Sequence, residues 1–382
     1  PQTVAPAPSV QQDVAAAVAP SEAQGGRGAD AAGAGSEVID ESSIAVLPFV
    51  NMSADKDNEY FSDGISEELL NVLVKVEGLS VASRTSSFAY KGREQSAASI
   101  GEELKVAHVL EGSVRKSGSR VRITAQLIDT GSDRHLWSET YDRELTDIFA
   151  IQDEIAKAIV DALRETLGDR ISAPTVAVTA DTDNLDAYQL YLKARELFFA
   201  RKQLDESVRL FEQVVTLDPE FARGWEGLAA ASAVIVDWVA IYPTIDRDAL
   251  LLRAEEAAGR ALTLDPNLSM PWATRSLVAG YLRPVDFAKQ IELIDRAIVA
   301  DARNATAFLW RGIYWVALGF MERALADFNQ CLEIDPAYGN CQRWKAVVIL
   351  FKGQTDDAIA LYQEGMAKGF NDNRGNSFVE PL

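Results

Sequence analysis

The stretch FLWRGIYWVALGFMERALADFNQCLEIDP, from Phe308 to Pro336, contains two amphipathic segments and ends at an Asp-Pro pair. Small residues such as Gly312 and Ala324 stand where two paired helices would touch, and large residues stand between them. The Asp-Pro pair recurs at Pro219 and Pro266, each time at the end of a similar segment. Proline ends a helix because it has no backbone N–H. We therefore predict an array of helical hairpins.

The spacing of these prolines is close to that of the tetratricopeptide repeat, whose period is about 34 residues. Pro266 and Pro336 are 70 residues apart, close to two periods, whereas Pro219 and Pro266 are 47 apart. We expect about five repeats, an all-α solenoid, over residues 185–370. The second repeat is longer than the pattern requires. Its segment Val234–Asp246 is either an insertion that covers a groove or docks a partner, or a lengthening of the two helices.

Stacked hairpins leave a concave groove, because one hairpin cannot bury its own apolar face. Such grooves bind peptides or partner helices through side chains on the first helix of each repeat. The second repeat adds the apolar side chain of Trp238. The candidate partner-binding residues are therefore Tyr191, Arg195, Trp225, Trp238, Arg275 and Arg311.

Residues 44–172 change their hydrophobic period several times, which predicts a separate α/β domain. The expected elements are strand Ile44–Phe49, helix Phe61–Val76, strand Leu79–Ala82, a short helix after Ser96, strands Val109–Arg115, Arg120–Ile128 and His135–Tyr141, and helix Ile148–Leu167. This order predicts an α+β two-layer sandwich, with helices covering one face of a mixed sheet.

An unusual loop, Ser83–Gly92, combines hydroxyl groups, two aromatic rings and two cations. It is either a recognition loop or anion site formed by Arg84, Phe88, Tyr90 and Lys91, or a packed loop anchored by the two rings. Asp63, Glu67 and Glu68 could serve acid and base chemistry as paired carboxylates, but they are expected as charges in the first turn of the preceding helix, where they suit the helix dipole.

Several ordered stretches of the α/β part resemble the TolB N-terminal-like, or FlgO-like, domain. They are Ile44–Phe49, Tyr60–Ile65, Ser86–Gly92, Val109–Arg115, Arg120–Asp129 and Tyr141–Arg143. The resemblance implies that tetratricopeptide repeats follow this domain. It also implies a single membrane span, with a winged-helix domain of the OmpR or CadC type, an adenylate cyclase domain or a kinase domain on the cytoplasmic side. It implies a sensory or scaffolding ectodomain and supplies no ligand.

Composition and motifs argue against other functions. The net charge of −20 does not suit direct binding to nucleic acid, and no apolar run approaches the length of a membrane span. The only histidines, His108 and His135, lie in no recognisable nucleophile setting. Ligand spacing for a metal and a glycine-rich phosphate loop are both missing from the sequence. We therefore predict no catalytic, cofactor or metal site.

The remaining segments are expected to be connectors. Residues 1–43 are rich in Ala, Pro and Gly and are predicted to be a disordered linker, followed later by a linker at 173–184 and a tail at 371–382. Because the sequence begins at Pro1 without methionine, we expect it to be part of a longer or processed protein. Cys331 and Cys341 could form a disulfide, or Cys331 could be a buried structural thiol.

The sequence thus predicts a non-enzymatic interaction and sensory module, the extracytoplasmic part of a membrane-anchored bacterial signalling protein or transcriptional regulator. We expect it on the periplasmic side of the inner membrane, held by an upstream anchor, with the cytoplasm as the alternative. A protein or peptide in the repeat groove is the expected partner, and the oligomeric state stays open. Two alternatives are a periplasmic assembly scaffold without signalling output and an unrecognised nucleotide-binding or catalytic α/β domain.

Overall fold

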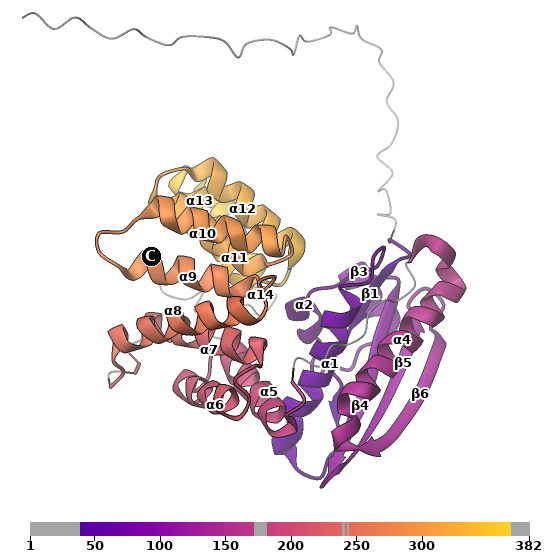
Figure 1. Ribbon diagram of the computed structural model, residues 1–382. Helices are drawn as coiled ribbons and strands as arrows, with labels where there is room; N and C mark the ends of the chain where they lie inside the picture. Colours follow the sequence, from indigo (N-terminus) through magenta and orange to yellow (C-terminus); the bar gives the residue numbers. More distant parts are fainter. Residues whose placement is uncertain (1–38, 172–181, 239–240, 243, 368–382) are drawn as a thin grey trace, which may run out of the picture. The chain divides into compact units, whose positions relative to one another are not determined.

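A computed structural model describes residues 39–171, 182–238, 241–242 and 244–367 (Figure 1). The described residues from Ile39 onward form one compact unit. Most of the predicted linkers, at 1–38 and 173–181, and the predicted tail at 371–382 lie outside the described residues. Within the described ranges, no helix has the length and apolar character needed to cross a membrane.

A mixed sheet forms the first half of this unit, as predicted. Its strands are β1 (Ser43–Val46), β2 (Val50–Asn51), β3 (Ser80–Val81), β4 (His108–Ser117), β5 (Arg120–Asp129) and β6 (Arg134–Glu144). They are ordered β3-β1-β4-β5-β6, and β2 also pairs with β4. Pairing is parallel from β3 to β4 and antiparallel from β4 to β6. Strand β1 begins at Ser43, whose hydroxyl accepts a hydrogen bond from the backbone N–H of Ala107.

Helices cover this sheet, but not on one face only. They are α1 (Glu59–Leu73), α2 (Arg84–Phe88), α3 (Ala97–Leu104) and α4 (Ile148–Leu167). Ile44 and Val46 share a core with residues of α1 and α4, whereas Ala45 and Leu47 share another with Ile100 of α3. Because side chains alternate along a strand, β1 is buried on both faces. The prediction that helices cover a single face was therefore wrong.

Two short helices show how far local signals reach. The Ser96 hydroxyl caps α3 by accepting from the backbone N–H of Ser99, as the sequence predicted. Helix α2 occupies part of the stretch predicted as a loop, and the Ser83 hydroxyl caps it in the same way, on the N–H of Ser86. With only five residues, α2 is too short to show a helical hydrophobic period.

Ten helices in five antiparallel pairs form the TPR-like array of the described residues (Figure 1). The pairs are α5 (Leu185–Phe199) with α6 (Leu204–Leu217), α7 (Ala222–Val234) with α8 (Arg247–Leu264), α9 (Met270–Tyr281) with α10 (Phe287–Ala300), α11 (Ala305–Ala317) with α12 (Met321–Ile334), and α13 (Gly339–Phe351) with α14 (Thr355–Ala367). In the fourth pair, a Cβ on Gly312 would lie 2.5 Å from the ring of Phe328, so only glycine permits this approach.

The long second repeat continues α7 into a 3-10 helix, η4 (Ile235–Trp238). Ile235 and Val236 are buried, whereas Ile241 is 62% exposed. The hydroxyl of Tyr242 accepts a hydrogen bond from the backbone N–H of Leu204. The extra residues therefore lengthen α7, and most of their described apolar side chains pack on the array.

The hydrophobic core is unevenly divided along the chain. One continuous cluster runs from the sheet through the first two repeats and enters the third at Val278 of α9. Repeats 3 to 5 contain two smaller clusters, one around Ile294 and one around Phe328. A disulfide between Cys331 and Cys341 joins α12 to α13, with their Cα atoms 6.3 Å apart.

Candidate interaction site between α1 and the first two repeats

Helix α1 lies directly against α5, the first helix of the array. A Cβ on Gly64 of α1 would lie 2.7 Å from Leu192 of α5, so the missing side chain lets the two helices approach. Tyr188 of α5 is fully buried, and its ring meets Phe149 of α4 edge to face with centroids 4.7 Å apart. Its hydroxyl accepts a hydrogen bond from the side-chain amide of Gln152. The first repeat thus packs on the sheet domain without an intervening gap.

Buried charges cross this contact. Glu67 and Glu68 on α1 face three guanidinium groups, those of Arg84 on α2, Arg195 on α5 and Arg223 on α7. Arg195 pairs with both glutamates, and one Arg223 nitrogen lies 2.8 Å from each carboxylate oxygen of Glu68. Arg84 Nε lies 3.1 Å from Glu67. We call these five residues the ion cluster.

The electrostatics of the ion cluster favour the charged forms. Burial alone would raise the pKa of Glu67, but Arg195 and Arg84 hold that pKa below its ordinary value. Burial would lower the pKa of Arg195, and Glu67 with Tyr191 raises it instead. Glu67, which is only 6% exposed, is thus kept ionised by its partners. Removing one member would take a buried partner from the oppositely charged groups that it contacts, and breaking a buried ion pair is destabilising.

Tyr191 and Arg195 were predicted to line an open groove, and this prediction needs correcting. The ring of Tyr191 is 3% exposed and lies 4.9 Å from that of Phe221. Its hydroxyl accepts a hydrogen bond from Arg195, and burial raises its pKa to about 12. Both side chains lie on the first helix of the repeat, as expected, but α1 of the same chain occupies the place predicted for a partner.

The other candidate residues do not gather in one site. Trp225 is half-buried and donates its indole N–H to the carbonyl of Pro219, and Trp238 in η4 is half-buried against the core. Arg275 pairs with Glu255 at 2.6 Å and lies over the ring of Trp272. Arg311 donates to Asp327 and Asp295, at 2.7 Å each. Both arginines are held within the array by neighbouring helices.

The predicted recognition loop is packed. Arg84 stacks between the rings of Phe88 and Phe199, at 4.3 Å from each centroid. Phe88 and Tyr90 are buried, and the Tyr90 hydroxyl donates to Glu103 at 2.7 Å. Lys91 pairs with Asp63 and Glu59 at 2.6 and 2.9 Å. This agrees with the alternative in which the two rings anchor the segment.

Three members of the ion cluster escaped sequence reasoning: Glu67, Glu68 and Arg223. The glutamates were taken for first-turn charges, but α1 begins at Glu59, so they lie in its middle. A signal was present, because Glu68 falls three residues after Ile65 and seven after Phe61, on the apolar face of the helix. A carboxylate on an apolar face requires a partner.

The fold and the interface define a protein with a TPR-like interaction array fixed to a mixed-sheet domain. The family model "HilA/YgeH-like transcriptional regulator, second domain" matches residues 40–158. The relative named "Putative adenylate cyclase 3" in Rhizobium meliloti (strain 1021) is 38% identical over 253 residues, which are 65% of this chain and 42% of that protein. The "Hsp70-Hsp90 organizing protein 3" of Arabidopsis thaliana is 23% identical over 101 residues, which are 26% of this chain and 18% of that protein. The chain thus spans less than half the length of these curated relatives.

Solved TPR structures are also similar to the chain. A thermophilic TPR protein from Thermus thermophilus aligns with a TM-score of 0.42 and 18% identity, over 49% of this chain and 93% of that one. PilW, a type IV pilus biogenesis factor, aligns with a TM-score of 0.36 and 18% identity, over 48% of this chain and 78% of that one.

Proposed function

We propose that this chain is the partner-sensing part of a bacterial signalling or transcriptional regulator. In this proposal the repeats bind a protein or peptide, and the sheet domain transmits the bound state to an effector elsewhere in the full-length protein. The observation that carries the proposal is the ion cluster within a continuous core, because it makes the sheet domain and the first two repeats move together. A ligand that displaces repeats 3 to 5 would therefore move them relative to the sheet domain and the first two repeats, which stay fixed to each other.

The comparisons support two classes of effector, and both are classes that a TolB N-terminal-like identity of the sheet domain, which is part of this proposal, would imply. The match at residues 40–158 to a domain of a transcriptional regulator supports a DNA-binding effector. The similarity to a relative named as a cyclase supports a nucleotide cyclase effector as the second candidate. We assign no reaction to the described residues.

We also propose that the chain works on the periplasmic side of the inner membrane, held by an upstream anchor. The Cys331–Cys341 disulfide supports this location, because structural disulfides persist in oxidising compartments. Alkaline phosphatase fused after Leu382 of the full-length protein should be active in cells, since that enzyme requires an oxidising environment. An inactive phosphatase together with a fluorescent cytoplasmic fusion would reject the periplasmic location.

Partner binding can be tested with a photoreactive amino acid placed in the full-length protein. Leu277 and Ile313 lie on the first helices of repeats 3 and 4, and Val299, which is 87% exposed, lies on a second helix. We expect discrete crosslinked products from positions 277 and 313, and none from position 299. Equal crosslinking at all three positions, or none at any, would reject a partner site on the first helices. An Ile313→Glu variant that loses the crosslinks but leaves effector output unchanged would favour a scaffold over a sensor.

A further inference from the structure

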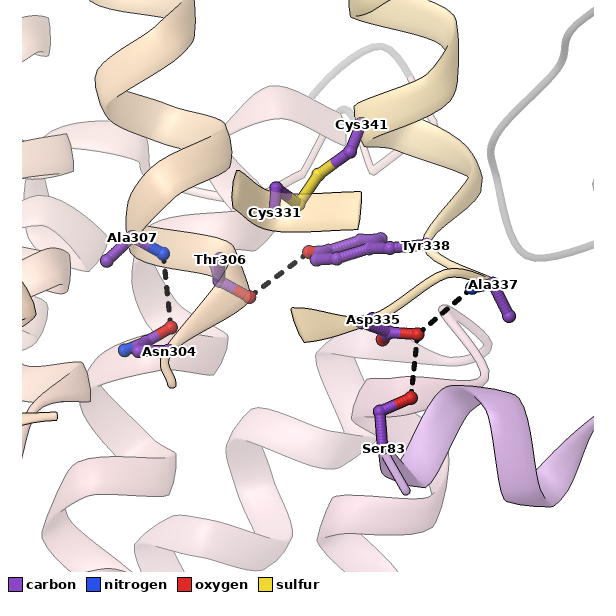
Figure 2. The surroundings of a disulfide bond; sticks show 9 residues. All are labelled: Ser83, Asn304, Thr306, Ala307, Cys331, Asp335, Ala337, Tyr338 and Cys341. Atoms are coloured by element: carbon purple, nitrogen blue, oxygen red, sulfur yellow. Dashed lines mark hydrogen bonds between the residues drawn. A yellow bond between two sulfur atoms is a disulfide. The ribbon is translucent and has the colours of Figure 1, made fainter. Parts of the chain in front are cut away.

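A second contact joins the sheet domain to the array at α2, beside Arg84 of the ion cluster. Figure 2 shows the turn between α12 and α13, where Asp335 meets the start of α2. The hydroxyl of Ser83 donates to the Asp335 carboxylate at 2.8 Å (Figure 2). The hydroxyl of Ser86 also donates to it, at 3.4 Å. Nearby, the Arg303 guanidinium donates to the carbonyl of Val81 at 2.7 Å. Repeat 4 is thereby held to the sheet domain through polar groups.

The turn that carries Asp335 is itself well fixed. The Cys331–Cys341 disulfide closes the chain on either side of it (Figure 2). The hydroxyl of Tyr338 shares a hydrogen bond of 3.1 Å with that of Thr306, at the start of α11. Asp335 also accepts from the backbone N–H of Ala337. The turn therefore presents a fixed carboxylate to α2.

The carboxylate is buried without a cation among its hydrogen-bond donors. Asp335 is 6% exposed, and its donors are hydroxyl groups and one backbone N–H. Burial raises the pKa of Asp335, and the hydroxyls of Thr85 and Ser83 only partly oppose this. Burying a carboxylate costs free energy, and opening the contact would return it to water. The closed form of this contact is therefore favoured over the open form by less free energy than in the ion cluster, where each glutamate faces arginines.

The hydrogen bond between Ser83 and Asp335 is added to a turn bond that recurs at the end of other repeats. Asp265 and Asp301 end α8 and α10 in the same way, and each accepts from the backbone N–H two residues further on. These bonds shape the turn between repeats. The carboxylate of Asp335 also accepts hydrogen bonds from hydroxyl groups at the start of α2. One residue therefore stabilises both the turn and the contact between the domains.

We propose that the α12–α13 turn is a releasable clasp, and that a partner binds the array by taking the place of α2 at Asp335. The partner segment would resemble Ser83–Ser86, a helix start that presents serine and threonine hydroxyls to the carboxylate. This inference rests on the proposed function, in that it identifies the chemistry of the partner. Release separates repeats 3 to 5 from the sheet domain while the ion cluster holds repeats 1 and 2.

Hydrogen exchange on the full chain tests the clasp without any partner. In Asp335→Ala we expect exchange in α2 to rise about tenfold or more, because a hydrogen bond to a charged group is lost. The matched control is Asp265→Ala, which loses the same turn bond and should leave α2 unchanged. Arg303→Met is a second variant that keeps its own backbone bond to Asp301 and should also raise exchange in α2. Unchanged exchange in both Asp335→Ala and Arg303→Met would overturn the clasp.

A synthetic peptide of residues 79–92 tests the binding chemistry. The Ser83→Ala/Thr85→Val/Ser86→Ala triple variant removes the three internal hydroxyl donors and keeps Asp335. We expect this variant to bind the peptide at least tenfold more tightly than the wild type does. Adding Asp335→Ala to it should abolish the gain. The control is Ser96→Ala, which removes a comparable helix cap from α3 and should leave peptide binding at the wild-type level.

The two experiments separate the possible failures. Raised exchange in α2 without peptide binding would overturn the assignment of Asp335 as the partner site. An opened clasp with peptide binding, but no crosslinked partner in cells, would count against the proposed function and not against the clasp.

Discussion

Repeats 1 and 2 and repeats 3 to 5 have the same helical design but are stabilised differently. The first two share one core with the sheet domain, and the ion cluster crosses that contact. In the last three, Val278 of α9 still belongs to that core, and the other buried apolar residues form smaller clusters, alongside a disulfide and a polar contact with α2. Similar repeat sequences can therefore build a fixed base at one end and a less firmly held arm at the other.

The difference arises from what each first helix meets. On α5, the apolar and charged side chains that would line a groove are covered by α1. In repeats 3 and 4, Arg275 and Arg311 are satisfied by carboxylates of neighbouring array helices instead. Because stability in a repeat array is a sum of local terms, the two regions can respond separately to mutation.

The largest effect is expected at the ion cluster. Arg195→Ala should lower the free energy of unfolding by about 3 kcal/mol, the lower end of the range for a broken buried ion pair, because Glu67 keeps Arg84 and Glu68 keeps Arg223. Urea unfolding followed by fluorescence would measure this loss, and hydrogen exchange should show it in both α1 and α5. Arg311→Ala is the comparison in the second region. It should raise hydrogen exchange in repeats 3 to 5 only. If both variants raised exchange over the same helices, the description of two separately stabilised regions would be contradicted.

The disulfide should matter next, and only for the second region. Replacing Cys331 and Cys341 by alanine opens a loop with a sequence separation of 10, for which chain entropy predicts a loss of about 3 kcal/mol. Exchange should rise in α12, α13 and α14, with α5 and α6 unchanged. If α5 exchanged faster as well, the array would unfold as one unit.

Acid should weaken the first region through Glu67. Its pKa is lower in the folded chain than the ordinary 4.5, so its stabilisation is complete above that value and is lost as the pH falls through the folded pKa. The difference in unfolding free energy between the wild type and Glu67→Gln should therefore shrink below pH 4.5. Urea titrations over a series of pH values measure it, and a constant difference would show that Glu67 is not ionised in the fold.

The smallest effects come from a matched pair of helix caps. Asn184 caps α5 and Asn304 caps α11, each by accepting from backbone N–H groups of the first turn. Alanine at either position should cost about 1 kcal/mol. We expect Asn184→Ala to raise hydrogen exchange in the helices of the shared core, and Asn304→Ala to raise it only in repeats 3 to 5. Exchange of α1 in the two variants distinguishes these outcomes.

Local sequence signals predicted most elements of the fold. The Ser96 cap, the strands on either side of Gly118 and the five helix pairs all depend on neighbours within a few residues. The contacts that make the candidate site do not. Ser83 and Asp335 are 252 residues apart, and Arg195 is 128 residues from Glu67. No periodicity links such distant partners, so sequence reasoning placed Arg195 on the correct helix and missed what covers it.

The side chain that Gly64 lacks bears on how such a chain can be dissected or recombined. Composition places a boundary near residues 173–184, yet close packing joins α1 to α5 across it. A fragment that starts at Leu185 would uncover Tyr188 and Leu192, which are 0% and 3% exposed in the whole chain. A chimera of two related proteins should fold only if the sheet domain is transferred together with the first two repeats. The segment that must be kept together in recombination is therefore longer than the sheet domain alone.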